Sequence, residues 1–341
     1  MMRILLVLLT ALSLFAAPKT LDVRLIDVEG GKALLVMTPA GESLLIDAGW
    51  PAGNSREAST DRIVEDLKAA GLRQLDYLLI SHYDLDHLGD VPRLVARFPV
   101  KHLVDHGPYT GDNAATQQRY GAYARLYERI PHIAVKAGDK LPLQGLDALV
   151  VTAAGKVITA PVNGGGAANP SCAANPRQAE LPTDKEDNNS VGILFTLGKF
   201  RMLDLADLEA YKNYELACPN NLVGTVDVLQ VNVHGQFKGM SPELVNALHP
   251  RVAMMGNGAK KGGDAPTWPL LRKTPDLEDI WQSHFSVNGG RENNPPEDFI
   301  ANLEPDDHWK TLQLSASPDG TFTVTNGRNG FHKTYKPGEF R

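Results

Sequence analysis

The stretch LLISHYDLDHLGD, residues 78–90, narrows the choice of fold more than any other part of the sequence. The apolar run at 75–82 predicts a buried strand, and the segment at 90–99 predicts a helix. Histidine and aspartate gather between them. Both are ligands for transition metals, and a strand end directs neighbouring side chains at one point. We therefore expect a metal site suited to two close ions rather than one, built from His82, Asp84, Asp86 and His87.

The rest of the chain predicts a layered α/β fold. Strands are expected at 21–28, 32–38, 43–49, 100–107, 190–198, 200–207, 226–235 and 251–258, and helices at 60–72, 113–130, 208–217 and 241–250. Thr60 or Asp61 is expected to cap the first of these helices, and Ser241 the last. The order strands, helix, strands occurs twice. We therefore expect two sheets with helices outside, a four-layer αβ/βα sandwich.

Two stretches lack this periodicity. Residues 152–189 are rich in glycine, proline, alanine and asparagine, and residues 256–310 hold proline, glycine, tryptophan and asparagine. We expect long loops at both places. The C-terminal part alternates like a hairpin around Pro318, Asp319 and Gly320. Residues 18–341 are expected to form a single domain.

The N-terminus predicts export. Arg3 precedes an apolar run at 4–15, and small residues with a proline follow at 16–18, which is typical of a signal peptide at 1–17. An uncleaved anchor is the alternative. After cleavage we expect a secreted or periplasmic protein without stable membrane insertion, because no other segment approaches transmembrane length.

Export bears on the two cysteines of the chain. Cys172 and Cys218 lie in loop-like surroundings and are expected to form a disulfide, with two unpaired thiols as the alternative. The net charge of −6, with 22% charged residues, gives no basic footprint for broad nucleic-acid binding. A local basic groove is compatible with this composition.

The motif at 82–87, His-x-Asp-x-Asp-His, resembles the His-x-His-x-Asp-His motif of the metallo-β-lactamase superfamily. Asp84 stands where that family has its second histidine. This variant looks like the ComEC-like branch, an extracellular hydrolase domain attached to a DNA-uptake channel protein. The resemblance covers residues 21–260 and implies the metallo-β-lactamase fold, which is an αβ/βα sandwich.

The resemblance implies two metal positions. The first metal would be held by His82 and Asp84. The second would be held by Asp86, His87 and His234, the last from the run VLQVNVHGQ.

The resemblance also implies a shared ligand and an orienting residue. Asp207 in RMLDLADLE would bridge the two metals, and Asp204 is its rival three residues earlier. Asp47 in LLIDAG would orient a ligand histidine through the free N–H of its ring. Asp86 and Asp207 are accordingly the expected catalytic residues.

One departure from the family concerns the first metal. The family's third motif usually supplies a histidine there, and this zone reads KEDNNSVGI. Asp187, Asn188 or Asn189 is expected to stand in, unless the first site is open. His106 is a more remote candidate, with a surface or substrate-facing position as its alternative.

The other departure concerns the substrate side. Val233 replaces the first histidine of the family's double-histidine motif, so only His234 remains. Asn257 matches an asparagine of the ComEC-like branch and is a candidate for substrate binding. Lys260 and Lys261, beside glycine-rich backbone, are candidates to contact a substrate phosphate, and a solvated loop is the alternative.

The implied function is metal-dependent hydrolysis. Two divalent ions, Zn or Mn, would share a hydroxide that attacks phosphorus or a carbonyl carbon. Asp84 adds a hard oxygen ligand, which favours manganese without excluding zinc. The branch favours a phosphodiesterase or nuclease-type activity on phosphoesters, DNA included. The alternatives are a lactonase or β-lactamase-type acyl hydrolase of the same fold, and a non-catalytic binding module with a weakened metal site.

Overall fold

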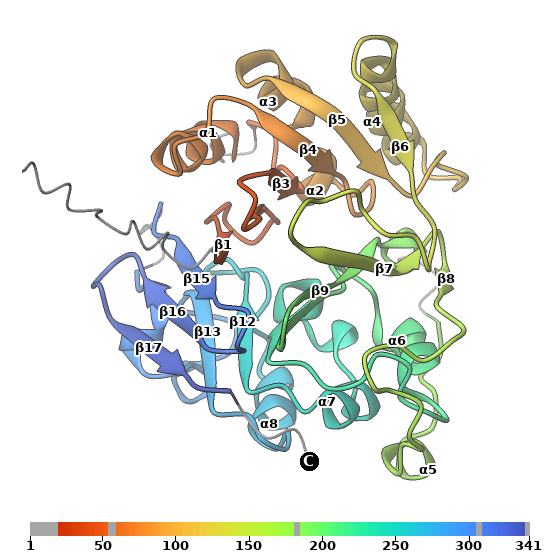
Figure 1. The fold of residues 1–341 in the computed structure, drawn as a ribbon, viewed down its shortest axis with the longest axis vertical. Coiled ribbons are helices and arrows are strands. Elements are labelled where there is room, and N and C mark those ends of the chain that lie inside the picture. Colours follow the sequence, from red (N-terminus) through yellow and green to blue (C-terminus); the bar gives the residue numbers. More distant parts are fainter. Residues whose placement is uncertain (1–19, 54–58, 181–184, 305–308, 338–341) are drawn as a thin grey trace, which may run out of the picture.

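The computed structural model describes residues 20–53, 59–180, 185–304 and 309–337. Two sheets pack against each other, and helices cover the outer face of each (Figure 1). The four-layer αβ/βα sandwich expected from the sequence is thereby confirmed. The expected signal peptide at 1–17 lies outside the described residues.

The first sheet has the strand order β17-β16-β15-β1-β2-β3-β4-β5-β6. It is antiparallel from β17 to β3 and parallel from β3 to β6. The hairpin expected around Pro318 is formed by β15 and β16. The strands of this sheet are β1 (Leu21–Leu25), β2 (Leu34–Met37), β3 (Ser43–Ile46), β4 (Leu75–Leu79), β5 (Val100–Asp105), β6 (His132–Ala134), β15 (Leu312–Ala316), β16 (Phe322–Asn326) and β17 (His332–Tyr335).

The second sheet has the strand order β14-β13-β12-β11-β10-β9-β7-β8. It is parallel from β14 to β10 and antiparallel from β10 to β8. Its strands are β7 (Asp147–Ala153), β8 (Lys156–Val157), β9 (Gly192–Leu197), β10 (Phe200–Asp204), β11 (Val228–Gln230), β12 (Val252–Met255), β13 (Asp279–His284) and β14 (Ile300–Asn302).

The helices divide between the two outer layers. Those against the first sheet are α1 (Ser59–Ala69), α2 (Leu85–Leu88), α3 (Val91–Arg97) and α4 (Ala114–Ala124), and those against the second are α6 (Ala210–Ala217), α7 (Pro242–Leu248) and α8 (Thr267–Arg272). The one-turn elements are α5 (Ser171–Ala174), η1 (Arg125–Glu128), η2 (Asp187–Asn189), η3 (Asn232–Gly235), η4 (Phe237–Gly239), η5 (Arg291–Asn293) and η6 (Glu297–Phe299). The helix expected at 113–130 is thus α4 followed by η1.

The helix caps agree with expectation in one case of two. The hydroxyl of Ser241 accepts a hydrogen bond from the backbone N–H of Leu244, as a cap of α7 should. The cap expected at Thr60 or Asp61 is wrong, because α1 already begins at Ser59. The Thr60 hydroxyl instead donates to Asp90, which ties α1 to the start of α3.

The inner strands are apolar on both faces because each face packs against a separate core. In β12, Val252 and Met254 face the core between the sheets, and Ala253 and Met255 face the core under the helices. Parallel strands buried on both sides read as continuous apolar runs. That is why their sequences identified them.

The long loop expected at 256–310 is wrong for much of its length. This stretch contains α8, β13 and β14, and the two strands extend the second sheet beyond β12. β13 reads DIWQSH, and its buried polar residues Gln282, Ser283 and His284 hide the pattern of a buried strand. The stretch 152–189 comes closer to expectation, since its described part holds the end of β7, β8 and the one-turn α5 and η2.

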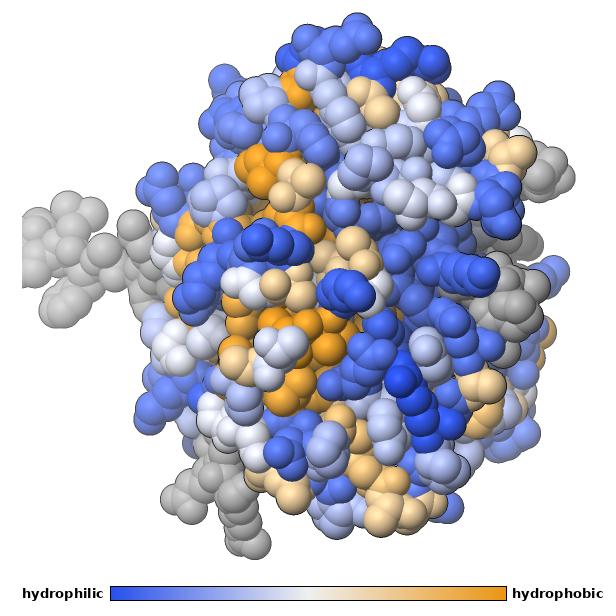
Figure 2. Space-filling view, turned by 90° about the vertical axis from the view of Figure 1, so that its right-hand side faces the viewer, coloured by the Kyte–Doolittle hydropathy of each residue, from blue (hydrophilic) through white to orange (hydrophobic). Residues whose placement is uncertain are grey.

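The surface is mainly hydrophilic on the face drawn in Figure 2, where hydrophobic residues gather in a central area. Among the described residues, the exposed large apolar side chains are Leu85, Phe237 and Val287. No helix within the described ranges is both long and apolar enough to cross a membrane.

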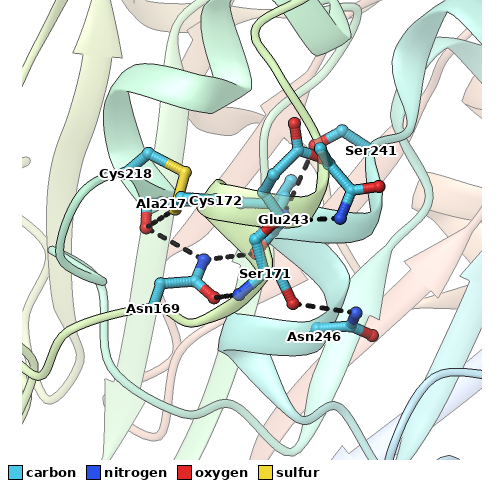
Figure 3. Close-up of a disulfide and its surroundings, with 10 residues drawn as sticks. Asn169, Ser171, Cys172, Ala217, Cys218, Ser241, Glu243 and Asn246 are labelled. Atoms are coloured by element: carbon cyan, nitrogen blue, oxygen red, sulfur yellow. Dashed lines mark hydrogen bonds between the residues drawn. A yellow bond between two sulfur atoms is a disulfide. The ribbon is translucent and has the colours of Figure 1, made fainter.

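A disulfide joins Cys172 in α5 to Cys218, which directly follows α6, as the sequence suggested (Figure 3). Beside it, the Asn169 side-chain amide donates to the carbonyl oxygens of Ala217 at 3.0 Å and Glu243 at 2.9 Å. The bridge and this amide together hold the irregular segment after β8 against α6 and α7.

Replacing Cys172 and Cys218 together by serine is expected to lower the free energy of unfolding by about 2–4 kcal/mol. The physical reason is that the bridge restricts the unfolded chain over a sequence separation of 46. Urea denaturation of wild type and variant, each with and without reductant, measures the difference. A variant as stable as the oxidised wild type would contradict the expectation.

Candidate metal centre

The loops that follow β3, β4, β10 and β11 meet at one place, and the loop after β4 forms the turn at 81–88. Backbone hydrogen bonds fix this turn against its neighbours. The N–H of Ala48 donates to the carbonyl of His87 at 2.8 Å, and that of Lys32 to the carbonyl of Asp86 at 3.0 Å. The side chains of the turn are therefore held by backbone before any ligand contributes.

Four side chains form what we call the Asp86 group: Asp86, His87, Asp207 and His234. One donor atom from each lies within 4.8 Å of the donors of the others, and all four residues are buried. The Nε2 of His234 lies 3.0 Å from Asp86 Oδ2 and 3.3 Å from Asp207 Oδ2. The Nε2 of His87 lies 3.4 Å from Asp207 Oδ1.

Three side chains form the His82 group: His82, Asp187 and Asp207. The Nε2 of His82 lies 3.6 Å from Asp187 Oδ1, is buried, and has no hydrogen-bond partner among the described residues. Asp207 belongs to both groups. The structure thus brings together six of the residues named from the sequence, in two groups that share one carboxylate.

The hydrogen bonds on the far side of the rings fix the tautomers. The Nδ1 of His87 lies 2.8 Å from Asp47 Oδ2, and the Nδ1 of His234 lies 3.1 Å from the Gly256 carbonyl. The Ser81 hydroxyl donates to Asp47 at 2.7 Å, so at 3.1 Å it accepts from the Nδ1 of His82. On a neutral ring the proton is therefore on Nδ1, and Nε2 offers its lone pair to the centre.

These lone pairs face one another. The Nε2 atoms of His87 and His234 are 3.3 Å apart. Two ring nitrogens at this distance need a proton or a metal ion between them. The residues present therefore fit a divalent cation, as the donor types also indicate.

The pKa shifts show how strongly the centre favours positive charge. Burial opposes the charged form of His87, but the carboxylates of Asp207 and Asp86 raise its pKa well above the usual value. Burial also opposes ionisation of Asp207, yet His234 and His87 hold its pKa well below the usual range. Burial and the charge of Asp207 raise the pKa of Asp187 well above its usual value. Crowded carboxylates of this kind stabilise any cation placed among them.

The backbone beside the ligands takes an uncommon conformation. Asp47, Ala206, Val233 and His234 have φ values of 65°, 50°, 49° and 54°. Left-handed backbone is unfavourable for such residues, and for a β-branched valine above all. The N–H of Val233 donates to the carbonyl of Ala206 at 3.0 Å, so the two turns that present His234 and Asp207 support each other.

Of the three candidates to replace the missing histidine, Asp187 is the one whose carboxylate reaches the centre. The side chains of Asn188 and Asn189 donate to Glu209 and Glu186 instead. Asp84 belongs to neither group, although its carboxylate is close enough to raise the pKa of Asp187. It lines a polar hollow of about 670 Å³ beside the centre, together with Asn188 and Asn189.

Asp204, the rival for the shared position, is held elsewhere. Its carboxylate oxygens lie 2.5 and 2.7 Å from the Nζ of Lys32, in a buried ion pair. Asp47 takes the orienting position expected for it, since it accepts from His87 and from the hydroxyl of Ser81.

His106 differs from expectation, and Asn257 is held by backbone contacts. His106 is buried rather than at the surface, and its Nε2 lies 3.1 Å from Glu186 Oε1. Asn257 is also buried, and its amide donates to the backbone carbonyls of Gly258 and His284. Its side chain is bonded to backbone in this structure, and the contact with substrate stays a prediction.

The two adjacent lysines, Lys260 and Lys261, lie in different environments. Lys260 is exposed to solvent. Lys261 contacts Asp86 Oδ2 through its Nζ, which also lies 4.7 Å from the centre of the Trp50 ring. Only Lys261 is therefore part of the centre.

Two residues at the centre carried no signal in the sequence. Lys238 lies 2.7 Å from Asp187 Oδ2, and Glu186 contacts both His106 and the backbone of Tyr83. Neither belongs to a recognisable motif, because each acts through a contact between segments that are distant in sequence.

The fold and this centre define a class, the metallo-β-lactamase-fold proteins. The metallo-beta-lactamase superfamily model matches residues 27–167, which include Asp47 and the turn at 82–87. The chain resembles this superfamily over those residues, and proteins with the metallo-β-lactamase fold typically bind two divalent metal ions.

Two curated relatives resemble the ComEC-like branch named from the sequence. ComE operon protein 3 of Bacillus subtilis is 25% identical over 265 residues, covering 74% of this chain and 30% of the relative. Recombination protein 2 of Haemophilus influenzae is 26% identical over 256 residues, covering 74% of this chain and 26% of the relative. The matches thus span less than a third of either relative.

Among solved structures, the metallo-beta-lactamase fold protein YhfI from Bacillus subtilis is 13% identical. The alignment covers 86% of this chain and 99% of that one, with a TM-score of 0.43. So remote a similarity assigns no activity.

Replacing Asp47 by asparagine is expected to weaken metal binding by about 10- to 100-fold while the fold persists. The amide puts a donor where the carboxylate accepts from His87 and Ser81, so the ring of His87 loses its orientation. Titration calorimetry with Mn²⁺ and Zn²⁺ measures the effect. Wild-type affinity in this variant would show that Asp47 has no orienting role.

Proposed function

We propose that this chain is a binuclear metal-dependent hydrolase of phosphodiesters. The observation that supports it best is Asp207, whose carboxylate belongs to both the Asp86 group and the His82 group. A carboxylate shared in this way suits two neighbouring cations. When bound, two divalent ions lower the pKa of a bound water and neutralise charge that develops on phosphoryl oxygens.

The chain's own residues would do three things. The donors of the two groups would hold the ions, with Asp187 in place of the family histidine. Asp47 and Ser81 would keep the ligand rings in the tautomer that leaves Nε2 unprotonated. The hollow beside the centre, whose lining includes Asp84, Asp112 and Lys212, would receive a polar part of the substrate.

The charges near the centre favour an anionic substrate over a neutral ester. Lys261 stands beside Asp86, and Lys238 stands beside Asp187, so each group has an ammonium at its side. Metal ions would take over the neutralisation of these carboxylates, and the ammonium charges would then favour a phosphoryl oxygen. An acyl substrate without charge would gain nothing from them.

The donor set bears on the metal. Carboxylates make up half of the six donor residues in the two groups. Hard oxygen donors suit manganese and imidazole suits zinc, so we propose Mn²⁺ or Zn²⁺. The apolar segment at 4–15 and the disulfide support a secreted or periplasmic location, because disulfides persist in oxidising compartments.

Asp86→Ala and His87→Ala are each expected to reduce turnover of bis-p-nitrophenyl phosphate at least about 100-fold, because each removes a ligand. Asp61→Ala, at an exposed carboxylate of α1, is the matched control. Rates with added Mn²⁺ or Zn²⁺ and thermal unfolding of each variant are the measurements. Wild-type turnover in either ligand variant would refute the assignment, and turnover of nitrocefin or a lactone alone would favour the acyl hydrolase.

Lys261→Gln is expected to raise KM for bis-p-nitrophenyl phosphate about tenfold, which is the value of one charge-assisted hydrogen bond. Lys260→Gln is the matched control, since Lys260 is the exposed neighbour. Steady-state kinetics of both variants are measured on the phosphodiester and on neutral p-nitrophenyl acetate. The comparison separates the effect of the Lys261 charge from the effect of its packing. An equal loss on both substrates would mean that Lys261 acts through packing alone.

A further inference from the structure

Glu186 contacts the segment that carries His82 and also the segment that carries Asp187, although it belongs to neither metal group. Its Oε1 accepts from the backbone N–H of Tyr83 at 3.0 Å, one residue after His82. Its Oε2 accepts from the side-chain amide of Asn189 at 2.9 Å, in the same turn as Asp187. One carboxylate therefore links the two segments that carry the first metal position.

His106 completes this arrangement from a third segment. Its Nε2 lies 3.1 Å from Glu186 Oε1, and its ring packs on Tyr83 with the ring centres 4.4 Å apart. Since a carboxylate only accepts, the Nε2 of His106 is the donor.

Tyr83 is held by Glu186 at its backbone N–H and by the loop after β5 at its side chain. It is fully buried, and its hydroxyl donates to the carbonyl of Gly107, the residue after His106. The loop that follows β5 thus holds Tyr83 through a side-chain ring and a backbone carbonyl. Tyr83 in turn carries the backbone that presents His82.

We propose that His106 and Glu186 form a positioning pair that sets the separation of His82 and Asp187, and with it the first metal position. The part of this proposal that concerns metal rests on the proposed function. The part that concerns the two segments stands on geometry alone.

Other contacts also hold the turn at 187–189, among them the hydrogen bond from the Asn188 side chain to Glu209 and that from the N–H of Ala154 to the carbonyl of Asn189. The N–H of Val191 donates to the carbonyl of Ser81 at 2.9 Å, which fixes the end of the turn next to β9. At the other end Asp187 is drawn toward Lys238, whose Nζ is 2.7 Å away. Glu186 adds the contact that joins this turn to the backbone next to His82.

Hydrogen exchange tests the geometric part without reference to metal. In the full chain, as purified and again after chelation, Glu186→Ala is expected to raise amide exchange about tenfold in both 81–84 and 187–190. His106→Ala should do the same to a smaller extent. His132→Ala is the matched control, because His132 also lies 2.8 Å from a buried carboxylate, that of Asp105, and belongs to neither metal group. Protection retained in either segment of the glutamate variant would overturn the proposal.

Metal titration tests the other part. Wild type is expected to bind two Mn²⁺ or Zn²⁺ ions, and Glu186→Ala is expected to weaken one binding step at least about tenfold while the other is unchanged. His82→Ala identifies that step as the first position. Glu186→Gln keeps the acceptor toward Tyr83 and should recover part of the loss. An equal weakening of both steps, or none, would overturn the positioning role. A wild type that binds fewer than two ions would refute the proposed function, and the exchange result would still decide on the pair.

Discussion

The metal centre of this protein is built around buried carboxylates whose mutual repulsion must be offset by positive charge. Asp86, Asp187 and Asp207 converge where water is largely excluded, and three histidine rings direct Nε2 atoms at the same place. Such a set is stable only if positive charge lies within it. Protons on histidine and the nearby lysine ammonium groups supply part of that charge, and the donor types make divalent cations the natural source of the rest.

The fold delivers these groups from segments far apart in the chain. The turns after β4, β10 and β11 carry the ligands at 82–87, 207 and 234, and the turn that precedes β9 carries Asp187. Hydrogen bonds among the turns, such as that from Val233 to Ala206, make the positions mutually dependent. The left-handed backbone at His234 persists because its neighbours enforce it. The arrangement of the ligands is therefore a property of the whole edge of the sandwich.

The sequence predicted the parts that local pattern determines. Apolar runs predicted the inner strands such as β12, and the density of ligand types at 82–87 identified the centre. It favoured Asp207 over Asp204 as the shared carboxylate, and the structure places Asp207 in both groups while Asp204, at the end of β10, pairs with Lys32.

What the sequence missed are contacts between distant segments. Nothing local distinguishes Lys238 or Glu186 from ordinary surface charges, and Asp187 was one of three candidates until the turn placed it against His82. β13 was hidden for a related reason, since its polar residues are buried against segments from elsewhere in the chain. His284, for example, lies 2.7 Å from Asp27.

The central claim is that two cations share the carboxylate of Asp207, and anomalous diffraction tests it most directly. Crystals grown with Mn²⁺ or Zn²⁺ should show two anomalous peaks, one among the donors of the Asp86 group and one among those of the His82 group, with an oxygen of Asp207 bound to each. A single peak, or two peaks that Asp207 does not join, would contradict the account.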